Sequence, residues 1–473
     1  MQGKPNFTEN EEVLRFISEK NVKILNLCHI PEDGRLKTLS FYAADRDKVE
    51  EILEFGERVD GSNLFSFIDP DQSDIYIKPQ VNKAFINPFS VMPTLNILCE
   101  YLDENGKPLP MAPKNVLAKA EEKLYASTGV TLKALAELEF YIIAKQEGET
   151  LFPNNSDKNY HESSPFAMFE NLRNEILVTL TEMGISTKYG HSEVGYRISK
   201  DNTLFEQHEI EFTPQSLGKT AENVAISKWV IRNICLKHGV AASFSPKISL
   251  EHAGNGMHIH LCALKNNKNI LVNDKAALSV EAKKIIGGLL RFSRSLTAFG
   301  NPTPVSHIRF IAHKESPMQI CWSARNRLAL IRIPLWWNFK KEKREKSSCR
   351  ETIEFRAPDP LANTYLLFAG IATATTYGLR NTKEALHLAR ELHIEKSNAK
   401  NKKFESLPRS CSESADNLKK DRELYEADNV FPKKLIDKTI EKLKAYNDEN
   451  LWENLNKKPK DIEKMLKNYL HYG

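Results

Sequence analysis

The chain has 473 residues, of which 41% are hydrophobic and 27% charged, and 67 basic residues against 62 acidic ones leave a net charge of +5. This length allows two or more domains, and the composition is typical of a soluble globular protein. So balanced a charge gives no reason to expect a nucleic-acid partner.

The first 105 residues are predicted to form a small domain of helices and strands. The N-terminus lacks the basic start and apolar run of a secretory signal. The turn sequence Pro-Glu-Asp-Gly at 31–34 joins two strand-like runs, and a loop with the sequence Asp-Gly-Ser-Asn begins at residue 60. The elements expected here are helices at 11–20 and 46–56 and strands at 22–30, 35–43, 64–68, 74–78 and 95–102.

A larger second domain is expected over residues 106–473, and it begins with a proline-rich linker at 108–113. Several of its strands follow one another without an intervening helix, which favours a mostly antiparallel sheet. We expect its strands at 132–145, 185–198, 204–212, 240–250, 256–264 and 328–334. We expect its helices at 114–128, 164–183, 217–238, 276–298, 361–379, 415–426, 431–446 and 460–470.

Three features of the chain bear on location and partners. Residues 360–379 carry no charge and have the length of a membrane span, but their Pro, Asn and Thr residues favour a helix buried in the core, so no membrane partner is expected. The seven cysteines are scattered, odd in number and without a C-x-x-C pair, which favours a reduced cytoplasmic protein. No G-x-x-x-x-G-K-[ST] loop is present, so any ATP site must be of another kind.

Acidic residues and histidines occur inside strand-like, otherwise apolar segments. Residues two apart on a strand project from the same face. Buried carboxylates are costly unless they are paired or metal-bound, and several Glu with a His suit a hard cation such as Mg²⁺ or Mn²⁺. One such segment is more often a solvent-exposed strand face, but five in one chain favour a metal site. The five contain Glu137 with Glu139, Glu209 with Glu211, His258 with His260, Glu193, and Glu354.

Arginines form a second chemical group. The apolar segment 323–334 holds three of them, and two more flank it. Guanidinium groups in such segments bind carboxylates or phosphates, although salt bridges to the glutamates would explain one or two of them. Divalent cations with an arginine cluster are typical of phosphoryl-transfer sites. The arginines are Arg309, Arg325, Arg327, Arg332 and Arg356.

In order, spacing and motifs, almost the whole chain resembles the type I glutamine synthetase family. The motifs that carry the resemblance are Asp-Gly-Ser at 60–62, Gly-Met-His-x-His at 256–260, Ser-Ala-Arg-Asn-Arg and Ile-Arg-Ile-Pro within 323–334, and Arg-Ala-Pro-Asp-Pro at 356–360. The resemblance implies an α+β fold: a small N-terminal β-grasp-like domain and a large catalytic domain with helices around a curved, mostly antiparallel sheet. It also implies a homododecamer with sites between subunits.

The resemblance implies a reaction and its cofactors. The γ-carboxylate of glutamate would attack ATP to give γ-glutamyl phosphate, and ammonia would then displace phosphate to form glutamine. ATP would be a co-substrate, and each site would hold two or more Mg²⁺ or Mn²⁺ ions. One ion would be held by Glu139, Glu193 and Glu209. The other would be held by Glu137, His258 and Glu354.

Further roles follow residue by residue from the same resemblance. Contacts with glutamate and ammonium are implied for Arg309, Arg356, Gly254, Tyr160 and Glu193. Contacts with the nucleotide are implied for His260, Arg332 and Arg350. Catalytic roles are implied for Asp60, Glu315, Arg327 and Arg332. Asp60 would favour deprotonation of ammonium, Glu315 would close over the intermediate, and the arginines would stabilise the transferred phosphoryl group.

Several positions depart from the family pattern. Ala253 replaces the usual Asn, Asn63 replaces a Ser, Thr352 replaces a basic residue, and Glu206 replaces a Gly. The segment around Glu315, which would form the flap that closes over the intermediate, has the unusual sequence His-Lys-Glu-Ser-Pro at 313–317. Three hypotheses therefore stay open. They are a glutamine synthetase, a γ-glutamyl ligase for another amine such as a polyamine or alkylamine, and a non-catalytic scaffold of the same family. The six retained metal ligands disfavour the third.

Overall fold

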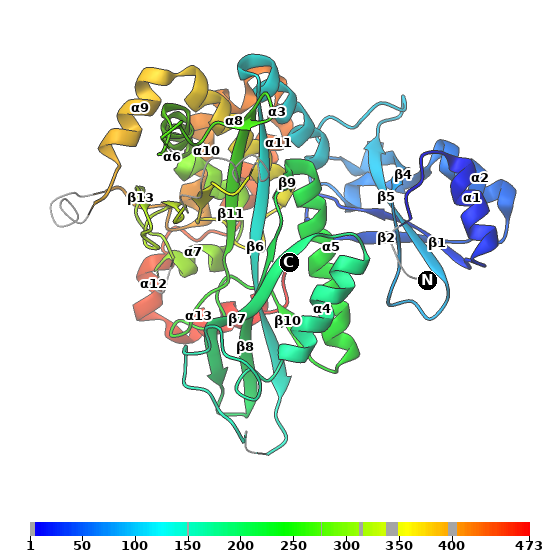
Figure 1. Ribbon diagram of the computed structural model, residues 1–473, viewed down its shortest axis with the longest axis horizontal. Coiled ribbons are helices and arrows are strands. Elements are labelled where there is room, and N and C mark those ends of the chain that lie inside the picture. The colour runs from blue at the N-terminus through cyan, green and yellow to red at the C-terminus, as the bar shows by residue number, and fades with distance from the viewer. Residues whose placement is uncertain (1–4, 149–150, 276, 312–315, 337–348, 396–403) are drawn as a thin grey trace.

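The computed structural model describes residues 5–148, 151–275, 277–311, 316–336, 349–395 and 404–473, and it contains two separate sheets (Figure 1). The first has five strands in the order β2-β1-β5-β4-β3. β1 and β5 are parallel, and all other neighbours are antiparallel. The elements of this part are α1 (Asn10–Glu19), β1 (Ile24–His29), β2 (Lys37–Tyr42), α2 (Arg46–Phe55), β3 (Glu57–Asp60), β4 (Asp74–Ile86) and β5 (Thr94–Leu102).

Local sequence signals explain the two helices of this part. In α2, Val49, Ile52 and Leu53 recur at helical spacing and are buried on one face. The side chain of Asp45 caps the first turn, and Gly56, with φ of 79°, follows the last. α1 buries one face in the same way.

The strand expected at 64–68 is wrong. Phe65 and Phe67 alternate as strand residues do and are buried, but their rings stack on each other at 4.9 Å within a turn. The edge strand is instead β3, which is only partly buried at alternate positions and has no apolar pattern to reveal it. As a consequence Asp60 is the last residue of an edge strand, and its carboxylate accepts hydrogen bonds from the loop that follows.

The second sheet carries the chemically important residues. Its main strands have the order β13-β14-β15-β11-β6-β8-β7. Only β13 and β14 are parallel neighbours, so the prediction of a mostly antiparallel sheet is confirmed. The strands are β6 (Val130–Lys145), β7 (Thr187–Ile198), β8 (Thr203–Phe212), β9 (Gln215–Ser216), β10 (Ala241–Ser243), β11 (Met257–Lys265), β12 (Lys268–Asn269), β13 (Trp322–Ala324), β14 (Ile331–Ile333) and β15 (Ile353–Phe355).

Helices surround this sheet (Figure 1). α4 and α5 pack against one side of the long strands, while α3, α6, α8, α9 and α10 pack on one another at one end. The helices are α3 (Pro113–Thr128), α4 (Glu170–Glu182), α5 (Leu217–Lys237), α6 (Val280–Gly300), α7 (Pro304–Ile311), α8 (Thr364–Arg380), α9 (Thr382–Glu391), α10 (Cys411–Glu426), α11 (Lys433–Lys444), α12 (Leu451–Lys457) and α13 (Pro459–Tyr469).

The uncharged segment near residue 370 is a helix of the core, as predicted. α8 is buried along most of its length and packs on α6, where a Cβ at Gly288 would lie 2.2 Å from the carbonyl oxygen of Ala374. Only glycine permits so close an approach of two helices. Within the described ranges, no helix is long and apolar enough to cross a bilayer.

Other elements also differ from the expectations. The strand expected at 240–250 ends at Ser243, because Pro246 cannot donate to a ladder and Asn255 donates instead to the carbonyl oxygens of Ser243 and Ser245. The helix expected from 164 begins at Glu170. The helices α7, α9 and α12 are short and were not predicted. The domain boundary at residue 105 stays a prediction.

Candidate active site

Strand register alone gathers the acidic and imidazole side chains on one face of the second sheet. Glu137 on β6 lies opposite Glu211 on β8 and His258 on β11. Glu139 lies opposite Glu209. Residues that face each other across antiparallel strands project to the same side, so all five side chains share one face. The alternation read from the sequence is therefore correct.

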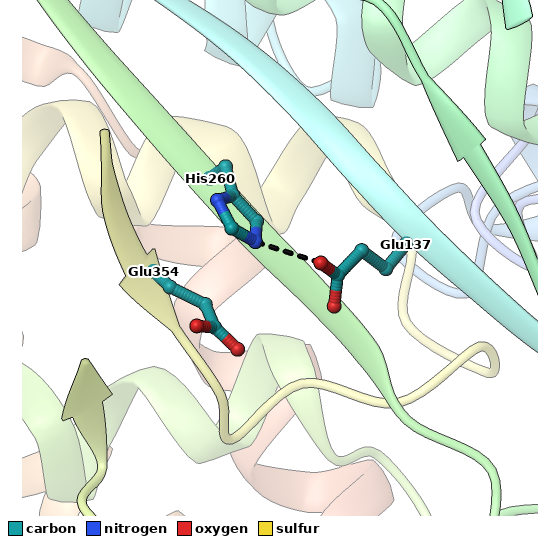
Figure 2. A group of neighbouring side chains, drawn as sticks. All are labelled: Glu137, His260 and Glu354. Carbon is teal, nitrogen blue, oxygen red and sulfur yellow. Dashed lines mark hydrogen bonds and ion pairs between the residues drawn. The ribbon is translucent and has the colours of Figure 1, made fainter. Parts of the chain in front are cut away.

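One group of these side chains, here called the histidine cluster, comprises Glu137, His258, His260 and Glu354. Figure 2 shows three of them converging from β6, β11 and β15. The two carboxylate oxygens of Glu137 lie 2.9 Å from His258 Nδ1 and 2.9 Å from His260 Nε2. Glu354 lies opposite His260 in the register and is fully buried.

The other group, here called the carboxylate cluster, comprises Glu139, His191, Glu193 and Glu209. His191 on β7 lies opposite Glu209 on β8, and Glu193 follows where the β7–β8 register shifts. His191 Nε2 is 3.4 Å from a Glu209 oxygen, and His191 Nδ1 is 3.9 Å from a Glu193 oxygen. Glu139 accepts a hydrogen bond of 2.7 Å from the backbone N–H of Gly256. The three glutamates are all more than nine-tenths buried.

The carboxylate cluster concentrates negative charge in a buried place. Burial, and then the carboxylates of Glu193 and Glu209, raise the pKa of Glu139 well above its usual range. Burial, with Glu137 and Glu193, raises the pKa of Glu209 in the same way. A divalent cation compensates such charge and favours the ionised carboxylates. The donor set of this cluster therefore fits a divalent metal ion.

In the histidine cluster, imidazole groups offset the negative charge of the carboxylates. Burial favours the neutral form of Glu137, but the imidazoles of His260 and His258 outweigh it and hold the pKa of Glu137 well below its usual range. Burial, and then the charge of Arg356, lower the pKa of His258 to about 4. Its ring is therefore neutral near pH 7, the form in which imidazole ligates metals. Glu137, His260 and Glu354 offer ligand atoms within 4.8 Å of one another.

Arginines border both clusters. Arg332 Nη1 donates to one oxygen of Glu354 at 2.6 Å, and Arg356 donates to the other. The buried Nε of Arg332 makes no hydrogen bond within the described residues, so it is an unsatisfied N–H donor beside Glu354. Arg309, on α7, donates to the carbonyl oxygen of Ala357 at 2.9 Å. The salt-bridge interpretation is thus correct for Arg332 and Arg356.

One cavity joins the predicted residues of both clusters with three arginines. Most of the ligands expected from the resemblance lie on its wall, and so does Gly254. Gln207 and Ser316 also contribute, and neither was predicted. The lining residues are Glu137, Glu139, Glu193, Gln207, Glu209, Ala253, Gly254, His258, Arg309, Ser316, Arg327 and Arg356.

Other predicted residues lie elsewhere. Asp60 is on the N-terminal sheet and does not line this cavity; its carboxylate accepts hydrogen bonds from Ser62 and Asn63, among others. Tyr160 is about half exposed, and its ring centroid is 5.4 Å from that of His191, beside the carboxylate cluster. Arg350 is exposed and two residues from Thr352. Glu315 lies outside the described residues.

Sequence reasoning assigned no role to two polar residues of the site. Gln207 donates to a Glu139 oxygen at 3.3 Å and to Asn255, so it holds a proposed ligand in place. The hydroxyl of Thr352 is 2.9 Å from Nδ1 of His260 and orients that ring. Each stands two residues before a predicted ligand, Glu209 or Glu354, so the period of two along a strand would have placed both on the ligand face.

The fold and the cavity together define an enzyme with carboxylates for cations and arginines for anions. Comparison with known proteins identifies the family. The model of the glutamine synthetase catalytic domain matches residues 110–466, and that of the glutamine synthetase beta-grasp domain matches residues 21–104. The chain belongs to the glutamine synthetase family, and it is a ligase. The predicted family and the α+β fold with a β-grasp domain are confirmed.

Relatives and solved structures agree with this assignment. The chain is 32% identical over 432 residues to the glutamine synthetase of Thermotoga maritima, covering 89% of this chain and 93% of that one. It is 31% identical over 412 residues to that of Pyrococcus abyssi, covering 86% and 87%. In fold it is similar to Plasmodium falciparum glutamine synthetase, with a TM-score of 0.81 at 22% identity over 94% and 98% of the chains. It is also similar to apo GmaS, with a TM-score of 0.75 at 20% identity over 93% and 98%.

Proposed function

We propose that this protein joins ammonia to the γ-carboxylate of glutamate, using ATP and passing through γ-glutamyl phosphate, to form glutamine. One observation carries the proposal. A single cavity is lined by carboxylates of both clusters together with Arg309, Arg327 and Arg356. Transfer of a phosphoryl group to a carboxylate brings several negative charges together. The carboxylates of this wall would hold metal cations, and these cations and the guanidinium groups would offset the negative charge.

The proposal assigns the metal ligands as the sequence predicted them. Glu139, Glu193 and Glu209 would hold one divalent ion, and Glu137, His258 and Glu354 would hold a second. Bound Mg²⁺ or Mn²⁺ would supply positive charge that neutralises the phosphate oxygens of ATP. If Glu354 binds the metal ion and no longer accepts from Arg332, the guanidinium of Arg332 would be available to bind a phosphate.

The residues around the ions would complete the reaction. Arg309 and Arg356 would grip the carboxylates of glutamate, because a guanidinium fork matches a carboxylate. Arg327 and Arg332 would stabilise the phosphoryl group as it leaves ATP, and His260 would lie beside the nucleotide. Closure by Glu315 would keep water from the acyl phosphate before ammonia displaces phosphate.

The position of Asp60 favours an active site shared between subunits. Within one chain it does not line the cavity, so its proposed role at the ammonium pocket needs the N-terminal loop of a neighbouring copy. We therefore propose a homododecamer with sites between subunits, working in the cytoplasm on small-molecule substrates. Tyr160 and Glu193 would complete the ammonium pocket with Asp60.

A second candidate is a γ-glutamyl ligase for a larger amine, and Ala253 favours it. Its side chain stands on the cavity wall where the family usually has Asn, and its methyl group can make no hydrogen bond to glutamate. Asn63, whose amide donates to Asp60, also changes the loop proposed for the ammonium pocket. A non-catalytic scaffold stays the third hypothesis.

Phosphate release from ATP and glutamate separates these candidates. It should be measured with Mg²⁺ and with Mn²⁺, first with ammonium and then with alkylamines and polyamines. Turnover confined to ammonium, with glutamine as product, supports glutamine synthesis. Turnover confined to a larger amine supports the second candidate, and no turnover with any acceptor would overturn both.

A further inference from the structure

His191 belongs to the carboxylate cluster although no metal role is assigned to it above. Its side chain is mostly buried, and one of its ring nitrogens, a Glu193 oxygen and a Glu209 oxygen all lie within 4.8 Å of one another. The register places it directly opposite Glu209 on the neighbouring strand. It therefore shares the face of the sheet from which the proposed ligands project.

The hydrogen bond made by the His191 ring indicates which ring nitrogen has a lone pair available for a metal ion. Nδ1 of His191 lies 3.0 Å from the carbonyl oxygen of Ser192. A carbonyl oxygen can only accept, so Nδ1 carries the proton and Nε2 of the neutral ring carries the lone pair. That lone pair is on the side of Glu209. Metal-binding histidines commonly have this arrangement, in which the second ring N–H donates to a backbone carbonyl and fixes the ring.

The distances also suit a shared ion. Nε2 of His191 and the nearest oxygen of Glu209 are 3.4 Å apart, with no hydrogen bond between them among those of the described residues. Two bonds of about 2.1 Å to one ion span that separation when they meet at roughly 105–110°, an ordinary angle for a divalent metal. The ring is held by neighbours, with centroids of His161 and Tyr160 at 4.4 and 5.4 Å.

We propose that His191 is a ligand, through Nε2, of the divalent ion held by the carboxylate cluster. The proposal rests on the metal-dependent ligase function above and adds an imidazole to a site otherwise made of carboxylates. Imidazole suits transition ions better than it suits Mg²⁺, which prefers oxygen ligands. The carboxylate cluster should therefore favour Mn²⁺, Co²⁺ or Zn²⁺ over Mg²⁺ more strongly than three glutamates would.

The test is metal binding by the full-length protein, with His191→Phe as the variant. Phenylalanine keeps a ring against Tyr160 and His161 but offers no lone pair. His161→Phe is the matched control, because it makes the same change in the adjacent imidazole. We expect His191→Phe to weaken Zn²⁺ binding at one of two sites by about ten-fold or more, while Mg²⁺ binding there changes by less than about three-fold. His161→Phe should change neither.

A spectroscopic readout is independent of affinity. With His258 and His260 both changed to Ala, His191 is the only imidazole of either cluster. Electron spin echo modulation of bound Mn²⁺ should then show a coupled ¹⁴N nucleus, and His191→Phe should remove it. Equal loss of Zn²⁺ and Mg²⁺ affinity, or no loss of either, would overturn the proposal. Failure of the unmodified protein to bind any divalent ion would overturn the proposed function as well.

Discussion

Glu139 on β6 lies directly opposite Glu209 on β8, and both residues are more than nine-tenths buried. Two like charges at such a position oppose folding unless a cation or a proton intervenes. Burial and the neighbouring carboxylates raise the pKa of both groups for this reason. A site built to bind metal is therefore expected to destabilise the metal-free protein.

Replacing Glu209 by Gln should stabilise the metal-free protein while abolishing activity. A carboxyl group with a raised folded pKa binds more protons in the folded state than in the unfolded one, so stability falls as pH rises above about 4.3, the unfolded value. Gln removes this loss, and we expect a gain of about 1 kcal/mol near pH 7.5. Thermal unfolding in EDTA at several pH values measures it. A less stable variant under these conditions would contradict the burial argument.

Metal binding should release protons, and affinity should rise with pH. Glu139 and Glu209 have raised pKa values, so a bound cation displaces protons from them, whereas His258, with its pKa lowered to about 4, is already neutral. Calorimetric titration with Mn²⁺ between about pH 6 and 8, in buffers of different ionisation enthalpy, counts the protons. A binding constant that does not change with pH would contradict the prediction.

Arg332→Ala should lower kcat by about 100-fold or more, because it removes a donor from the transferred phosphoryl group. Arg332→Lys should recover part of this, since an ammonium keeps the charge but not the fork. Arg422, a partly buried residue of α10 that pairs with Glu426 and Asp437 and does not line the cavity, provides the control, and Arg422→Ala should keep full activity. Two Mn²⁺ ions should still bind each variant. Unchanged kcat in Arg332→Ala would remove this residue from the mechanism.

Gly256→Ala should impair the site without unfolding the protein. A Cβ at this position would lie 2.6 Å from Nε2 of His258 and 2.7 Å from Nη2 of Arg309, so both side chains must shift. A misplacement of that size should reduce kcat by about ten-fold or more. Gly218→Ala, in the first turn of α5, meets no atom within 4 Å and should leave both kcat and Tm nearly unchanged. Equal activity of the two variants would contradict the close packing.

Much of this site could be predicted from periodicity. Because side chains on a strand alternate with a period of two, the pairs Glu137 with Glu139 and His258 with His260 had to share faces once their strands were recognised. The antiparallel register of β11 and β6 then places His258 opposite Glu137. The long helix α8 was recognised because nearly all of it lies in the uncharged segment 360–379, and a long segment without charge is expected to be buried.

Other features depend on contacts that no local pattern contains. The edge strand β3 has charged residues at positions that face solvent, so it could not be told from a loop. Arg309 lies on the short helix α7, and only the tertiary fold places it against His258, at 3.5 Å. His191 stands two residues before Glu193, but its position opposite Glu209 follows only from the β7–β8 register.

The most direct test is where metal binds. Crystals of the full-length protein soaked with Mn²⁺ should give two anomalous scattering peaks per chain, one within the carboxylate cluster and one within the histidine cluster. The first should lie within bonding distance of Glu139, Glu193 and Glu209, and the second of Glu137, His258 and Glu354. Peaks at other places, or none at either cluster, would contradict the proposal that these six side chains hold a pair of divalent cations.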